Sequence, residues 1–320
     1  MRKNLLIGAI TNYGWDDIAP FFNSYVQAGF ENCECVMFTG GMLERTVAKM
    51  RSCGVDVRPI PEELLPEPII NTRWKIYADF LSDNRDKYNM VITADVRDVI
   101  FQQDLFKLCD DSKPFLGIAL EDGLIGENGT NTKWIIDAYG NEIYQELKDE
   151  TIICVGTVWG KAEEFLKYSQ IMSDILNSEW AARRNVIEQA VGNYIIYHDK
   201  MFADVLSPST NADGPVMTIG LTDTKDIHTD SAGNVLNGKD QIAAVVHQYD
   251  RKPNIVRIAL KKYGRGVSLL YKFLYPIFLT RISKYKDSNF IRKLAILLLF
   301  KAGRIGFAAA FMNAVKKRLP

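Results

Sequence analysis

The sequence predicts an α/β protein whose core is a doubly wound mixed sheet flanked by helices. Short apolar segments, each suited to a buried parallel strand, alternate with amphipathic segments over residues 1–60. Glycine follows two of the amphipathic segments, at Gly29 and Gly54, as expected at helix ends. An acidic cluster directly follows a later apolar segment, and open α/β sheets bind ligands at such strand ends.

The elements can be assigned in chain order. Residues 1–60 give the order strand, helix, strand, helix, strand, which is typical of a doubly wound sheet. We expect strands at residues 5–10, 35–38, 55–60, 89–93, 115–120, 152–158 and 243–246. We expect helices at residues 17–28, 43–53, 71–81, 162–176 and 182–197. Together they predict one α/β domain over residues 1–255.

Residues 256–320 are expected to form a basic, amphipathic, helical tail. Residues 259–320 carry fourteen Lys and Arg and one acid, Asp287, so their net charge is +13 and the rest of the chain carries −13. The apolar runs at 271–279 and 294–300 are shorter than the roughly 20 residues that cross a bilayer. Basic flanks and interfacial tyrosines predict helices on an anionic membrane surface. The alternative is a helical subdomain packed on the core; nucleic acid is not expected, because no base-reading module is present.

The cysteines predict the compartment. The chain has five of them, and neither their number nor their spacing suits a disulfide framework or a zinc site. The apolar run near the N-terminus is too short for a signal peptide. We therefore expect a cytoplasmic protein, held by its tail at the inner face of the cell membrane.

Residues 93–98 read Thr-Ala-Asp-Val-Arg-Asp and carry the most informative chemistry. An apolar strand delivers Asp95 and Asp98 to the ligand-binding edge of the sheet. Carboxylates there can hold Mg²⁺ or Mn²⁺, and such a cation stabilises a departing diphosphate. Taken alone, the cluster fits a helix cap or a solvated turn equally well.

Residues 93–102 resemble the Asp-x-Asp region of GT-A nucleotide-diphospho-sugar glycosyltransferases, particularly a bacterial type with Asp-Val-Arg-Asp in this place. Residues 245–251, which contain His247, resemble the late segment that supplies a further metal ligand. Arg73 resembles a basic residue that reaches the nucleotide or its diphosphate. The loop after the first strand resembles the nucleotide-base loop and contains Thr11, Asn12 and Tyr13. The resemblance covers about residues 4–255.

The resemblance implies a metal site formed by Asp95, Asp98 and His247. Arg97 is a departure, because it stands where a strict Asp-x-Asp has its second acid. Either Asp98 ligates the metal instead, or Arg97 neutralises phosphate charge without a metal. A lone histidine such as His247 could also be a hydrogen-bonded structural residue.

Two further segments are candidates for the sugar and the acceptor. Gly156 and Trp159 resemble the strand that lines the donor sugar, or they mark a strand end that packs Trp159 in the core. Trp134 has the same two interpretations. Glu188, beside Gln189, could act as general base on an acceptor hydroxyl, or it could be an exposed helix carboxylate.

The predicted activity is that of a hexosyltransferase-type enzyme. A sugar would pass from a nucleotide diphosphate donor to a hydroxyl of a lipid-linked or membrane-bound glycan, as in envelope polysaccharide biosynthesis. One alternative is a sugar-nucleotide nucleotidyltransferase, although residues 11–14 have one glycine and no basic residue. The other is a non-catalytic, membrane-bound scaffold.

Overall fold

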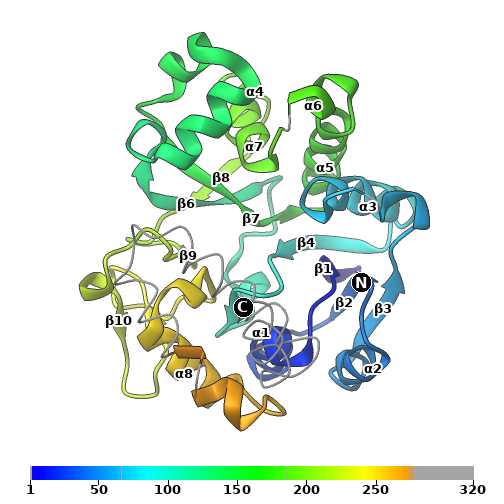
Figure 1. Ribbon diagram of the computed structural model, residues 1–320, viewed down its shortest axis with the longest axis vertical. Coiled ribbons are helices and arrows are strands. Elements are labelled where there is room, and N and C mark those ends of the chain that lie inside the picture. The colour runs from blue at the N-terminus through cyan, green and yellow to red at the C-terminus, as the bar shows by residue number, and fades with distance from the viewer. Residues whose placement is uncertain (1, 66, 185, 274, 277–320) are drawn as a thin grey trace, which may run out of the picture.

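A computed structural model describes residues 2–65, 67–184, 186–273 and 275–276 (Figure 1). Its strands and helices alternate as the sequence predicts, and the described strands form a mixed sheet between helical layers. The predicted α/β, doubly wound fold class is therefore confirmed. The part of the predicted tail beyond residue 276 lies outside the described residues. No helix in the described part of the chain has the length and apolarity that a membrane span requires.

The N-terminal half forms a parallel unit. Strands β3, β2, β1 and β4 lie side by side in that order, and all three pairs are parallel. The strands are β1 (Lys3–Thr11), β2 (Cys33–Gly40), β3 (Val55–Pro59) and β4 (Tyr88–Ala94). The helices that connect them are α1 (Trp15–Ala28), α2 (Glu44–Ser52) and α3 (Ile69–Asp83). Gly29 ends α1 in the left-handed conformation, with a φ of 64°, as the sequence predicts.

The second half extends this sheet with antiparallel and short strands. Beyond β4 the order is β7, β6, β9, β12 and β5, and β8 pairs with β6. The strands are β5 (Val99–Phe101), β6 (Leu116–Leu124), β7 (Thr151–Lys161), β8 (Leu206–Ser209), β9 (Val216–Thr218) and β12 (Val245–His247), with a separate pair β10 (His228–Thr229) and β11 (Val235–Leu236). The helices are α4 (Gly129–Leu147), α5 (Ala162–Leu176), α6 (Glu179–Arg184), α7 (Glu188–Tyr197) and α8 (Pro253–Tyr263). Short 3-10 turns lie at Glu62–Leu64, Leu105–Leu108, Ile125–Glu127, Thr224–Asp226 and Tyr249–Arg251.

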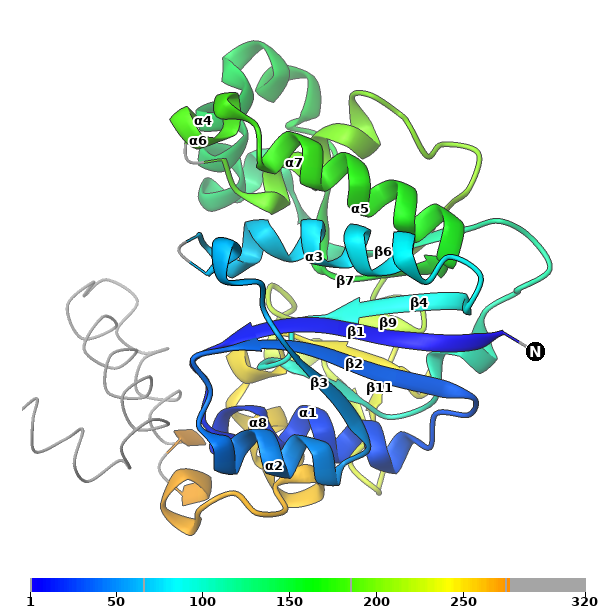
Figure 2. The same ribbon diagram turned by 90° about the vertical axis from the view of Figure 1, so that its right-hand side faces the viewer.

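Helices cover both faces of the sheet. Figure 2 shows α3 and α5 on one side of β1 and β4, and α1, α2 and α8 on the other. One core cluster includes Phe21 of α1 and Val256 of α8, and the other includes Trp74 of α3 and Phe165 of α5, all completely buried. Apolar burial on both faces explains why the central strands are continuous apolar runs.

Three of the differences from the sequence expectations concern helices. The helix expected at 182–197 is two helices, because Ile187 adopts an extended conformation before α7. Helix α4 was not expected; its backbone breaks at Gly140, where φ is 86°, so its apolar periodicity is interrupted. The boundary expected at residue 255 lies inside α8, whose apolar face is part of the core.

Candidate active site

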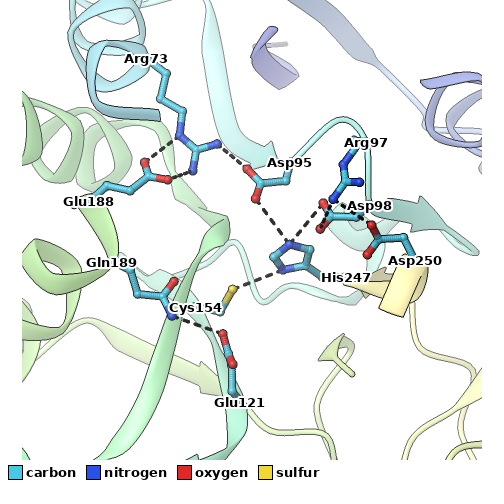
Figure 3. A network of polar contacts seen from close by, with 10 residues as sticks. All are labelled: Arg73, Asp95, Arg97, Asp98, Glu121, Cys154, Glu188, Gln189, His247 and Asp250. Atoms are coloured by element: carbon cyan, nitrogen blue, oxygen red, sulfur yellow. Dashed lines mark hydrogen bonds and ion pairs between the residues drawn. The ribbon is translucent and has the colours of Figure 1, made fainter. Parts of the chain in front are cut away.

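The carboxyl end of β4 and the end of β12 meet at one point of the sheet. Asp95 follows β4 directly, and its N–H donates to the carbonyl of Gly156 at 2.8 Å. His247, the last residue of β12, is paired with Val99, the first residue of β5. The short turn that joins β4 to β5 therefore carries Asp95 and Asp98 to His247 (Figure 3).

The three side chains enclose a small polar gap. His247 Nε2 lies 3.6 Å from Asp95 Oδ2 and 3.6 Å from Asp98 Oδ1, and the three ligand atoms lie within 4.8 Å of one another. His247 is 1% exposed, and its Nε2 has no hydrogen-bond partner among the described residues. A buried polar atom without a partner is costly, and 3.6 Å is too long for a hydrogen bond. A divalent cation between two carboxylates and an imidazole satisfies all three groups, so these residues fit the expected Mn²⁺ or Mg²⁺.

The electrostatics of this site favour positive charge. Burial alone would raise the pKa of Asp95, but Arg73 and His247 lower it well below its usual range. Burial alone would lower the pKa of His247, but Cys154, Asp98 and Asp95 together raise it well above its usual range. The site thus holds an ionised carboxylate and attracts either a proton or a metal cation to the imidazole.

Gly156 allows the backbone to approach this centre. A Cβ at this position would lie 2.3 Å from Cε1 of His247 and 2.7 Å from Oδ2 of Asp95. Real Cβ contacts are not this short. The sequence pattern placed Gly156 against the ligand; the structure places it against two of the three candidate metal ligands.

Cys154 and Asp250 contact the site and were missing from the predicted site residues. Cys154 Sγ lies 3.3 Å from His247 Nδ1, so the thiol holds the ring nitrogen that faces away from the carboxylates. Asp250 Oδ2 accepts from Arg97 Nη2 at 2.8 Å. Asp250 could have been found, because it lies three residues after His247; one cysteine inside an apolar strand gives no such signal.

Arg73 lies between two carboxylates. It is 4% exposed, and its Nη1 donates to Asp95 Oδ1 at 2.5 Å. Its Nε and Nη2 donate to Glu188 at 2.9 and 2.6 Å, a bidentate pair. Arg73 was expected to reach the nucleotide or its diphosphate. In the structure its Nε, Nη1 and Nη2 donate to Glu188 and Asp95, so Arg73 contacts the site through Asp95.

Glu188 is neither an exposed helix carboxylate nor open to an acceptor. It is 7% exposed, and Trp74 Nε1 donates to it at 2.6 Å in addition to the two bonds from Arg73. Burial raises the pKa of Glu188 to about 7, against the opposing effect of Arg73. The expected general base is therefore enclosed, and it holds the arginine that orients Asp95.

Trp159 packs in the core, as the second of its two interpretations predicts. It is 3% exposed, and its ring lies where a side chain on Gly117 of the neighbouring strand would be. The expectation that it stacks on the donor sugar is corrected: it fills the core. Trp134 is half-buried beside the other core cluster.

The rim of the site carries the remaining predicted residues. Strands β1 and β4 are parallel neighbours, so Thr11 at the end of β1 and the following Asn12 and Tyr13 lie at the same sheet edge as Asp95. Asn12 has a φ of 62°, and its N–H donates to the carbonyl of Gly40. Arg97 is 43% exposed, pairs with Asp250, and lies 4.0 Å from Asp98.

Gln189 lies across the site from Arg97 (Figure 3). Its Nε2 donates to Glu121 Oε1 and to Asn131 Oδ1, each at 3.3 Å. These groups come from α7, β6 and α4, so the helical lobe, which consists of α4, α5, α6 and α7, contributes Gln189 and Asn131 near the candidate metal site.

No protein-family model matches the chain, and no curated protein matches it. The solved structures that it is similar to include glycosyltransferases. One is the galactosyltransferase LgtC in complex with donor and acceptor sugar analogues, with 16% identity, 84% of this chain and 99% of that chain covered, and a TM-score of 0.49. Another is the glycosyltransferase GlyE of Streptococcus pneumoniae TIGR4, with 14% identity, 89% and 64% covered, and a TM-score of 0.45. A third is the core-mannan synthase CmsA of Aspergillus fumigatus in its Mn/GDP form, with 13% identity, 65% and 73% covered, and a TM-score of 0.41.

Proposed function

We propose that this protein is a metal-dependent glycosyltransferase that moves a sugar from a nucleotide diphosphate sugar to a hydroxyl. One observation carries the proposal: the buried Nε2 of His247, without a hydrogen-bond partner among the described residues, faces Asp95 and Asp98 at 3.6 Å. Two carboxylates and an imidazole form a donor set for Mn²⁺ or Mg²⁺ at a strand end, where α/β sheets bind nucleotides.

Each side chain at the site has its own proposed role. Asp95, Asp98 and His247 would hold the cation, which when bound supplies charge neutralisation for the diphosphate leaving group. Arg73 fixes Asp95 by binding Oδ1, which leaves Oδ2 directed at the gap. Because Arg73 already orients the Asp95 side chain, that side chain loses little conformational entropy when the cation and the donor bind.

The nucleotide is assigned to the rim beside β1. The loop of Thr11, Asn12 and Tyr13 would contact the base, and the half-exposed guanidinium of Arg97 lies close enough to Asp98 to meet phosphate oxygens beside the cation. Asp250 pairs with Arg97 and thereby holds the guanidinium in place at the rim.

The acceptor is proposed to be a lipid-linked or membrane-bound glycan of an envelope polysaccharide pathway. The support is the charge of +13 over residues 259–320, which suits an anionic leaflet and a protein peripheral to the inner face of the cell membrane. Liposome co-sedimentation of the full chain and of a chain ending at residue 276 tests this part; equal binding to anionic vesicles contradicts it.

Donor hydrolysis tests the enzyme itself. The full chain is incubated with UDP- and GDP-sugars, with Mn²⁺ or with EDTA, and released nucleotide is measured. We expect release that requires Mn²⁺ and is lost in His247→Ala. His198→Ala is the matched control, because His198 is a histidine paired with Glu146 on the helical lobe.

Two outcomes oppose the proposal. Release that survives both EDTA and His247→Ala means that the three residues hold no catalytic cation. No turnover with any donor, together with no nucleotide-induced rise in melting temperature, favours the scaffold alternative, because a bound ligand stabilises the folded state.

A further inference from the structure

A cavity lies in the helical lobe, and none of the candidate metal ligands lines it. Its volume is about 780 Å³, and it opens among α4, α5, α6 and α7, the helices at the top of Figure 1. Its walls include the aromatic residues Tyr139, Trp180 and Tyr194 and the apolar residues Ile136, Ile143 and Ile175. A cavity of this size accommodates a small ligand.

A column of three aromatic rings, two stacked and the third tilted by 39°, forms one wall. Tyr139 and Tyr194 stack with centroids 3.9 Å apart and planes 6° apart, and Trp180 lies 5.2 Å from Tyr139. Arg184 covers Trp180 at 5.3 Å. The column joins α4, α6 and α7, so aromatic side chains from three helices form this wall.

Polar groups surround this apolar wall. The carboxylates of Asp137 and Asp174 and the hydroxyl of Ser178 line the cavity with Arg184. The hydroxyl of Tyr139 is buried and has no hydrogen-bond partner in the part of the chain that the structure describes. A buried hydroxyl without a partner is costly unless a ligand or a water completes it. The break in α4 at Gly140 keeps the neighbouring space open, since a Cβ there would meet nothing within 4 Å.

We propose that this cavity binds a neutral sugar unit of the acceptor glycan. A sugar ring presents apolar C–H groups that suit aromatic and isoleucine side chains, and hydroxyls that donate to carboxylates and accept from a guanidinium. Asp137 is paired with Lys133 at 2.5 Å, so Asp174 is the carboxylate that a sugar hydroxyl would meet. The assignment to an acceptor rests on the proposed function; the binding of a sugar does not.

The position suits a part of the glycan remote from the reacting hydroxyl. Helix α7 begins at Glu188, which contacts the arginine beside Asp95, and continues to Tyr194 in the cavity wall. Six residues of α-helix span about 9 Å. Along the axis of α7, the cavity wall therefore lies within the length of a short glycan from the residue that contacts Arg73.

Fluorine NMR of protein labelled with 5-fluorotryptophan tests the binding directly. The chain has five tryptophans, and the Trp180→Phe variant assigns the signal of Trp180. Lactose, maltose, cellobiose and chitobiose are each added at millimolar concentration. We expect at least one to shift the Trp180 signal while the signal of the core residue Trp159 stays fixed, and we expect the shift to need roughly ten- to hundredfold more sugar in Asp174→Asn, because a hydrogen bond to a charged group is lost.

Three results overturn the proposal: no sugar moves the Trp180 signal, Asp174→Asn responds like the parent, or Trp159 moves equally. Tyr139→Phe keeps the ring column and removes only the hydroxyl, so it gives a second test if Asp174→Asn folds poorly. It should raise the concentration of the responding disaccharide that gives half of the Trp180 shift about fivefold, and an unchanged concentration opposes the proposal. Failure of donor hydrolysis in the parent would remove the glycosyltransferase proposal but leave the NMR result to decide the sugar site.

Discussion

Gly156→Ala adds one carbon atom against the candidate metal site and therefore tests it directly. The added Cβ would lie 2.3 Å from His247 Cε1 and 2.7 Å from Asp95 Oδ2. Carbon atoms in contact are separated by about 3.5–4.0 Å, so the imidazole must move by roughly 1 Å. Displacement on this scale costs on the order of 100-fold in rate when it misplaces a catalytic group.

The same substitution has a stability cost that can be separated from its effect on activity. Overpacking typically costs about 1–3 kcal/mol, and each kcal/mol lowers the melting temperature by about 2–4 °C in a chain of this size. Gly123→Ala is the matched control, because the nearest atom to its added Cβ is Leu221 Cδ1 at 3.4 Å, an ordinary contact.

The assay is Mn²⁺-dependent release of nucleotide from a donor sugar, measured as kcat/KM over a Mn²⁺ titration. We expect Gly156→Ala to need more Mn²⁺ and to lose most activity below its melting temperature, while Gly123→Ala behaves as the parent. Equal kcat/KM and equal Mn²⁺ dependence in the two variants would refute the placement of the metal between Asp95 and His247.

Three further predictions concern Cys154, Arg73 and Asp17. Cys154→Ala removes the partner of His247 Nδ1 and should weaken Mn²⁺ binding about 10–100-fold by calorimetry; unchanged affinity contradicts an orienting role. Arg73→Lys cannot reproduce the bidentate pair and should cost about 3–5 kcal/mol in urea unfolding, part of which Glu188→Gln in the same chain should restore; two additive losses would oppose this coupling. Burial raises the pKa of Asp17 from its ordinary value of 3.8 to about 6. The folded state therefore holds a proton that the unfolded state releases, stability should fall as pH rises from about 4 to about 6, and Asp17→Asn should lack this decline in urea unfolding across that range.

The sequence predicts features that depend on the local pattern of apolar residues and on the order of the elements. The apolar run before Asp95 and the short run before His247 are local signals, and both residues lie at strand ends of one sheet. Gly29 and Gly54 likewise have positive φ at the ends of helical segments. These features need no knowledge of tertiary contacts.

The roles of side chains that depend on tertiary packing could not be predicted from the sequence. Glu188 was expected to be solvent-facing or acceptor-facing, but the packing of α7 near α3 turns it toward Arg73 and Trp74. Trp159 enters the core because the register of β6 and β7 places Gly117 opposite it. Neither the facing helix nor the strand register is encoded in the local pattern around these residues.

The position of β12 has a consequence for how the protein matures. This strand inserts between β9 and β5, and β5 follows the turn that carries Asp98. His247 therefore reaches the two aspartates only after nearly the whole domain has been synthesised and threaded into its sheet. Chains that end before this strand would carry Asp95 and Asp98 without His247, so under the proposed function they should bind Mn²⁺ more weakly than the full chain.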